Sequence, residues 1–185
     1  MASLRILIGL FMLAVPAAAQ EPNAATTASA AQVAINAALR WIAANSTYEP
    51  IAVRHWVPLK AEDMAANAWM LHVAADPQMV FSMYSCARRT LYFRADADFN
   101  DAVVFSFLVH ELTHHLQCET GRSEVDLCGW ERQAYGLQGA YLQSVIKAGA
   151  KDGRRLSRAE MSAAQATEAD LDRRRDAACA DLRRR

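Results

Sequence analysis

Neither sign of charge is in excess in this chain, and no apolar run is long enough to cross a membrane. The 185 residues carry 20 Lys and Arg against 20 Asp and Glu, which argues against a polyanionic partner such as nucleic acid. The arginine runs at 173–175 and 183–185 have acids just upstream, which favours a solvated helix end. The apolar run Ile6–Val15 is half the roughly 20 residues that a bilayer core requires. A stable membrane anchor is therefore not expected.

The N-terminus has the features of a cleavable secretory signal. Arg5 provides a short positive start, Ile6–Val15 provide the apolar segment, and Ala17–Ala19 offer an A-x-A cleavage site. The first cysteine is Cys86, so no cysteine near the cleavage point could accept a lipid. We therefore predict a secreted or periplasmic protein with a signal peptide (1–19), a flexible leader (20–30) and a single domain (31–185).

Only four cysteines are present, and all of them lie in the mature part of the chain. In an oxidising compartment four cysteines usually form two disulfides, and three pairings are open. We favour Cys118–Cys128, because the first ends one helical segment and the second precedes the next, with Cys86–Cys179 tying the chain end to the sheet. The spacing does not match the C-x-x-C pattern of thiolate zinc sites.

The apolar pattern predicts an α+β domain in which a small mixed sheet packs on a buried helix and the C-terminal half is helical. Helices are expected where apolar residues recur at helical spacing, and strands where β-branched and aromatic residues form short runs. The predicted helices span 31–44, 61–75, 102–117, 129–148 and 157–182, and the predicted strands span 51–57, 79–85 and 90–94. The last two strands form a hairpin or are sheet neighbours. Ser157 and Glu160 have the spacing of a capping box before the charged last helix.

Residues 110–114 form the most informative pattern in the chain, H-E-x-x-H. His110 and His114 lie four residues apart on one helix face, so both imidazoles can bind one metal ion. Glu111 lies about 100° round the helix, close enough to hydrogen-bond a water at that ion. Chance would produce the pattern in roughly 0.6% of such sequences. The helix is apolar nearly all round and therefore buried, and buried ionisable side chains need a partner such as a metal. Histidines that only hydrogen-bond their neighbours are the alternative.

A catalytic zinc site commonly has three protein ligands, so two histidines leave one ligand to be found. No histidine follows residue 115, and a carboxylate is the natural replacement. The candidates are Glu119, Glu124, Asp126 and Glu131. We favour Glu131, because it opens the next helix and a returning helix would bring it back to the histidines. Glu119 is too close to the second histidine, Glu124 and Asp126 stay open in the connecting loop, and helix-dipole complementarity is a structural alternative for Glu131.

With these residues the chain resembles the zincin superfamily of metallopeptidases, and within it the gluzincin arrangement, in which a glutamate on a second helix completes the site. The matching residues are His110, Glu111, His114 and Glu131. The resemblance covers residues 90–138, about a quarter of the chain. The surroundings suggest one of the small exported bacterial families.

The resemblance also implies two further features of the site. One is an edge strand before the H-E-x-x-H helix that pairs with an extended substrate, which we place at Thr90–Arg94, an ordinary sheet strand being the alternative. The other is a Tyr or His that stabilises the oxyanion. Tyr135, one helical turn after Glu131, is our candidate, and the alternatives are His55, His72 and His115. His115 points elsewhere on the helix and is not expected to be a ligand.

We therefore predict an exported zinc metallopeptidase whose partner is a peptide or protein substrate. Zn²⁺ on His110, His114 and Glu131 would activate a water, and Glu111 would take its proton and pass it to the leaving amine. The alternative is a non-enzymatic envelope protein whose structural zinc has four protein ligands instead of an open water position. An interaction module built on the charged C-terminal helix is a third possibility.

Overall fold

The computed structural model describes residues 24–70, 80–121 and 126–182, and it confirms an α+β fold. The expected signal peptide, His72 and Glu124 lie outside these residues. The helices are α1 (Ala24–Asn45), α2 (Ala61–Met70), α3 (Ala102–Glu119), α4 (Leu127–Ala148) and α5 (Arg158–Leu182). The strands are β1 (His55–Leu59), β2 (Ser82–Ser85), β3 (Thr90–Arg94), β4 (Ala150–Lys151) and β5 (Arg154–Arg155).

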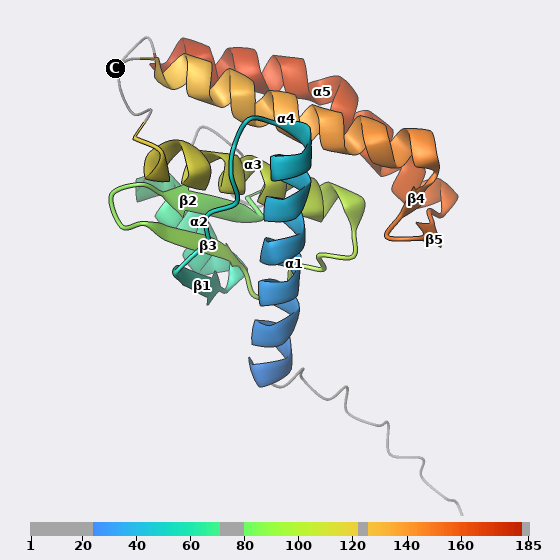
Figure 1. The fold of residues 1–185 in the computed structure, drawn as a ribbon, viewed down its shortest axis with the longest axis horizontal. Coiled ribbons are helices and arrows are strands. Elements are labelled where there is room, and N and C mark those ends of the chain that lie inside the picture. The colour runs from blue at the N-terminus through green and yellow to red at the C-terminus, as the bar shows by residue number, and fades with distance from the viewer. Residues whose placement is uncertain (1–23, 71–79, 122–125, 183–185) are drawn as a thin grey trace, which may run out of the picture.

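The layers of the fold place α3 in the middle of the molecule. Figure 1 shows α4 and α5 side by side on one side of α3, while the three-stranded sheet lies on the other and α1 crosses the molecule. The main hydrophobic core draws side chains from α1, β3, α3, α4 and α5. Leu108, Leu112 and Leu116 of α3 are fully buried in it. The predicted buried helix is therefore confirmed, and the residues it carries are held rigidly by packing.

Helix α1 begins at Ala24 instead of the expected Ala31, so residues 24–30 are helical where we predicted a flexible leader. The segment is rich in alanine, which has the highest intrinsic helix propensity. Ile35, Leu39 and Ile42 are spaced four and three residues apart and are buried against the core. The buried stripe anchors the helix, and the propensity of its alanines extends it towards the N-terminus.

The sheet is mixed, as predicted, with the strand order β1-β3-β2. Strands β2 and β3 form the expected antiparallel hairpin, and β1 pairs with β3 in parallel. Strand β1 starts at His55 instead of residue 51 and includes Pro58, which an edge strand tolerates because one of its sides needs no ladder hydrogen bonds. The expectation that Thr90–Arg94 is an edge strand is wrong, because this strand is β3 and it pairs with β1 on one side and with β2 on the other.

The boundaries of α3, α4 and α5 follow from capping and turn residues. Asp101 caps α3 by accepting hydrogen bonds from the backbone N–H groups of Val103 and Val104, at 2.7 and 3.0 Å. Helix α4 ends at Gly149, whose φ of 62° is a left-handed conformation that glycine adopts without strain. The predicted capping box is confirmed, since Ser157 N–H donates to Glu160 Oε2 at 2.8 Å and Glu160 N–H donates to Ser157 Oγ at 3.2 Å.

Both disulfides are present, but the pairing we favoured is wrong. Cys86 pairs with Cys118, and Cys128 pairs with Cys179. Cys86 follows β2 in the hairpin turn, and α3 packs against β2, so the last turn of α3 brings Cys118 to the hairpin. Helices α4 and α5 pack in antiparallel fashion, which places the first turn of α4 beside the last turns of α5. Tertiary packing therefore decides both pairings.

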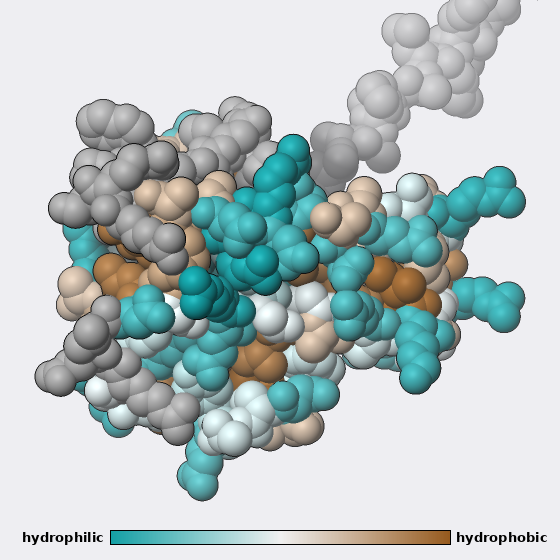
Figure 2. Space-filling model, turned by 90° about the horizontal axis from the view of Figure 1, so that it is seen from above, coloured by the Kyte–Doolittle hydropathy of each residue, from teal (hydrophilic) through white to brown (hydrophobic). Residues whose placement is uncertain are grey.

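The outer face of the two C-terminal helices is mostly hydrophilic. Figure 2 shows this face, on which smaller hydrophobic patches lie between charged side chains. On α5, Asp170 pairs with Arg173 and Arg174, and Asp172 pairs with Arg175. These pairings match the expectation that the arginine run at 173–175 belongs to a solvated helix. Within the described ranges, no helix is long and apolar enough to span a membrane.

Candidate metal centre

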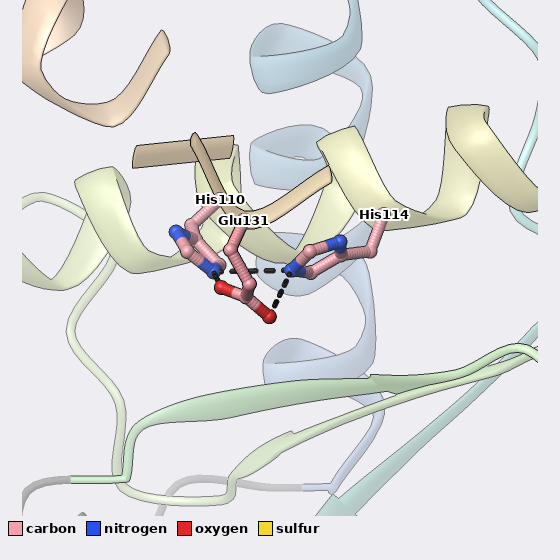
Figure 3. Close-up of side chains that lie close together, drawn as sticks. All are labelled: His110, His114 and Glu131. Carbon is pink, nitrogen blue, oxygen red and sulfur yellow. Dashed lines mark hydrogen bonds and ion pairs between the residues drawn. The ribbon is translucent and has the colours of Figure 1, made fainter. Parts of the chain in front are cut away.

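Helix α3 places His110 and His114 one turn apart on the face that points towards α4. Their Nε2 atoms are 3.1 Å from each other, and Figure 3 shows both rings directed at one point. The side chains are only 9% and 14% exposed. The four-residue spacing therefore has the consequence that the sequence predicted: two imidazole nitrogens share one small volume.

Helix α4 supplies a carboxylate to the same point. The two oxygens of Glu131 straddle the histidines, with Oε2 at 3.5 Å from Nε2 of His110 and Oε1 at 3.5 Å from Nε2 of His114 (Figure 3). Within the described residues, these three side chains form a group that could hold a metal ion. The preference for Glu131 is thus consistent with the structure. Among the other candidates, Glu119 instead pairs with Arg89 at 3.6 Å, and Asp126 is exposed at the start of α4.

Glu111 lies beside the three residues and is held by the sheet. Its Oε2 accepts a hydrogen bond of 2.7 Å from the backbone N–H of Tyr84 in β2. This N–H points away from β3, because β2 is an edge strand whose alternate backbone groups face outward. The carboxylate is therefore fixed between the H-E-x-x-H helix and the strand edge that lies beside it.

Burial and neighbouring charges shift the pKa values of these three groups in different directions. Burial alone would lower the pKa of His110, but Glu131 and Glu111 raise it above its ordinary value. Burial and the neighbouring His110 lower the pKa of His114 to about 4. Burial opposes ionisation of Glu131, yet its contact with His110 lowers its pKa. The contact between His110 and Glu131 therefore favours the charged forms of both groups, whereas the surroundings of His114 favour its neutral ring.

Glu111 behaves differently from Glu131. Burial raises the pKa of Glu111 to about 7, although His110 and the amide of Tyr84 act in the opposite direction. Such a carboxyl group can take up and release a proton near neutral pH, which is what acid–base catalysis requires. The two glutamates are therefore set apart by their surroundings, because the pKa of Glu131 is lowered and that of Glu111 is raised.

The predicted oxyanion stabilisers lie in different places. Tyr135 is at the site: its ring packs edge-on against His110, with centroids 4.4 Å apart, and burial raises the pKa of its phenol. His115 is turned away, since its Nε2 donates to Ile51 O at 3.0 Å and its Nδ1 accepts from the Tyr84 hydroxyl at 3.1 Å. His55 lies on β1, and β3 separates it from β2, the strand whose Tyr84 amide binds Glu111. Of the described candidates, Tyr135 therefore stands nearest to the histidines.

Sequence reasoning missed two buried glutamines at the outer side of the histidines. Gln117 accepts a hydrogen bond of 2.8 Å from Nδ1 of His114, and Gln138 lies beside His110 and raises its pKa. Both glutamines are fully buried. Their positions carry a signal: Gln117 lies three residues after His114 and Gln138 lies seven after Glu131, on the ligand-bearing faces of α3 and α4.

The fold and the site define an α+β protein with a partly buried His-His-Glu group between two helices, a glutamate beside it and two disulfides. Residues 27–150 match a protein family described as a domain of unknown function, DUF6647, and the chain belongs to this family. The matched range includes the three members of the group and Glu111, whereas α5 lies outside it. No curated protein and no solved structure matched the chain.

Proposed function

We propose that this protein is an exported zinc metallopeptidase with a gluzincin-like site. The observation that carries the proposal is the convergence of His110, His114 and Glu131 from two helices, with Glu111 held beside them. Two imidazoles and one carboxylate are a ligand set of known catalytic zinc sites, and the H-E-x-x-H spacing supplies the general base on the same helix.

The spacing of the three side chains fits a tetrahedral zinc ion. With bonds of about 2.0–2.1 Å, such an ion holds its ligand atoms about 3.3 Å apart. The Nε2 atoms of His110 and His114 are 3.1 Å apart, and each lies 3.5 Å from a different oxygen of Glu131. With one ligand atom taken from each residue, the three atoms all lie within 4.8 Å of one another. Glu131 and Glu111 raise the pKa of His110, so they favour a positive charge at this point of the site. The same carboxylates would stabilise a bound cation, which has to displace any proton that the histidine carries.

The roles of the residues follow from their positions. When bound, zinc would polarise the scissile carbonyl and acidify water. Glu111 would take a proton from the attacking water and pass it to the leaving amine, a task suited to its pKa of about 7. The Tyr84 amide would orient this carboxylate, and Tyr135, whose ring packs against His110, would donate from its phenol to the developing oxyanion.

A peptide is the substrate class that the neighbouring sheet edge favours. β2 lies beside α3 and is an edge strand of the described sheet, so an extended chain could pair with those of its outward backbone groups that Glu111 does not use. Two disulfides fit an extracellular protein. Together with the signal sequence, they support export to the periplasm or medium, where the substrate would be a peptide or a folded protein.

The experiment compares zinc content and hydrolysis in four forms of the purified mature protein. We expect the wild type to hold one zinc and to cleave a peptide library, and the double variant H114A/E131A to lose the metal. E111Q should keep the zinc and lose hydrolysis, whereas the matched control E119Q, on the same helix but paired with Arg89, should retain both. Full activity of E111Q would contradict the role of Glu111 as general base.

The number of protein ligands on the zinc distinguishes a catalytic site from a structural one. In the described parts of the chain the metal-binding group has three members, which supports an open position for water. X-ray absorption on the zinc form should therefore show three protein ligands and one light oxygen ligand. A fourth side chain on the metal would favour the structural alternative.

A further inference from the structure

Gln117 connects the ligand histidine of α3 to the helix that carries Glu131. Its Nε2 donates to the backbone carbonyl of Trp130 and to Oε1 of Gln133, both at 3.1 Å. Because these acceptors fix its amino group, its carbonyl oxygen faces Nδ1 of His114 at 2.8 Å. An amide oxygen only accepts hydrogen bonds, so His114 must donate from Nδ1. Its Nε2 then keeps a free lone pair.

Gln138 has the corresponding position on the opposite helix. Its Nε2 donates to Ser106 Oγ at 3.1 Å, and that hydroxyl gives its own proton to the Val103 carbonyl at 2.7 Å. The amino group of Gln138 is therefore fixed, which leaves its oxygen for His110. Oε1 of Gln138 and Nδ1 of His110 are both buried without a hydrogen-bond partner. Gln138 is a neighbour of His110, so each of these atoms could supply the partner that the other lacks.

Burying these two amides is costly unless their hydrogen-bonding groups are used. Both side chains are 0% exposed, and an unsatisfied buried amide costs about 1–3 kcal/mol. A methionine of similar length would fill the same space without this cost. The position of each amide oxygen next to one histidine accounts for polar side chains in an otherwise apolar helix interface.

We propose that Gln117 and Gln138 are positioning residues, each accepting the Nδ1 proton of one histidine so that both Nε2 lone pairs point at the metal. The proposal rests on the metal site of the proposed function. Outer partners of this kind fix the tautomer and orientation of ligating histidines, and their loss typically weakens metal binding by 10- to 100-fold. Carboxylates or backbone carbonyls usually have this role; here one side-chain amide from each helix performs it.

The test combines a tautomer measurement with metal affinity. In the metal-free wild type at alkaline pH, ¹⁵N NMR of the imidazoles should show Nδ1–H and a bare Nε2 in His114, because Gln117 accepts its Nδ1 proton and its Nε2 accepts from Nε2 of His110. Zinc affinity is then measured by competition with a chromophoric chelator. Q138M should bind zinc about 10- to 100-fold more weakly. Q138E should restore binding, because a carboxylate accepts the same proton and Ser106 can turn its hydroxyl to donate to it.

The control is Q143M, which changes a glutamine of α4 that is exposed and bonds Glu168; it should keep wild-type affinity. A wild type in which neutral His114 carries its proton on Nε2 would overturn the proposal. So would a Q138M variant that unfolds more easily but binds zinc as tightly as the wild type, since the glutamine would then be structural only. Failure of the wild type to cleave peptides refutes the proposed function alone, because the tautomers are read in the metal-free protein.

Discussion

Replacing Glu111 with glutamine should make the metal-free protein more stable at neutral and alkaline pH. Burial raises the pKa of Glu111 from its ordinary value of 4.5 to about 7. Ionised Glu111 therefore destabilises the folded state relative to the unfolded chain. Glutamine has nearly the same shape, and its Oε1 can still accept the hydrogen bond from the Tyr84 amide. The variant thus removes the buried charge and keeps the contact.

The sign and size of the effect follow from proton linkage. Between pH 4.5 and 7 the folded protein still holds a proton that the unfolded chain has lost, so stability falls as pH rises through this window. One pKa unit corresponds to about 1.4 kcal/mol, and the penalty above pH 7 is therefore up to about 3 kcal/mol. E111Q should gain this amount at pH 8 and almost nothing at pH 4.

Urea unfolding of the chelator-treated protein at pH 4, 6 and 8 measures the difference. The matched control is E62Q, a change at an exposed glutamate of α2, which should alter stability by less than about 0.5 kcal/mol at every pH. A constant difference between E111Q and wild type across the three pH values would refute the reasoning. A loss of stability in E111Q at pH 8 would show that the ionised carboxylate is stabilised by its surroundings.

Two further predictions concern the proton at the site and the cross-links. Zinc affinity should weaken as pH falls below neutral, because Glu131 and Glu111 raise the pKa of His110 and the metal must displace its proton. Calorimetry in two buffers of different ionisation enthalpy should detect the proton that zinc releases. An affinity that is independent of pH would contradict this prediction. Changing Cys128 and Cys179 to serine opens a loop of 51 residues and should lower the free energy of unfolding, measured in urea, by about 4 kcal/mol. A decrease of less than ~1 kcal/mol would show that packing alone holds α5 in place.

The features predicted well from sequence depend on residues close together in the chain. The pairing of His110 with His114 follows from helix periodicity, and the capping box of Ser157 and Glu160 follows from a three-residue spacing. The choice of Glu131 needed one further step, the return of the next helix after a short connection. These inferences use local geometry that the backbone imposes wherever the segment lies in the fold.

The errors concern contacts that only the tertiary arrangement determines. A short loop made Cys118–Cys128 attractive, yet helix packing carries each cysteine to a different partner. Thr90–Arg94 precedes the H-E-x-x-H helix in the chain, but β1, far upstream, pairs with it and makes it central. Gln117 and Gln138 were missed for the same reason, since a glutamine on an apolar face becomes informative only when the opposite helix is in place.

The stability that the two disulfides provide offsets the destabilising effect of ionised Glu111 at the site. Cys118 lies one helical turn after His114, and Cys128 lies just before Glu131, so each helix that supplies a ligand is fastened close to that ligand. Loop-closure arithmetic gives each disulfide about 4 kcal/mol, which exceeds the roughly 3 kcal/mol that ionised Glu111 costs. A small domain can therefore keep a buried, proton-exchanging carboxylate beside two histidines without unfolding. If this compensation holds, the wild type with both disulfides reduced should have a lower free energy of unfolding at pH 8 than at pH 5. In reduced E111Q, the difference in this free energy between the two pH values should be smaller.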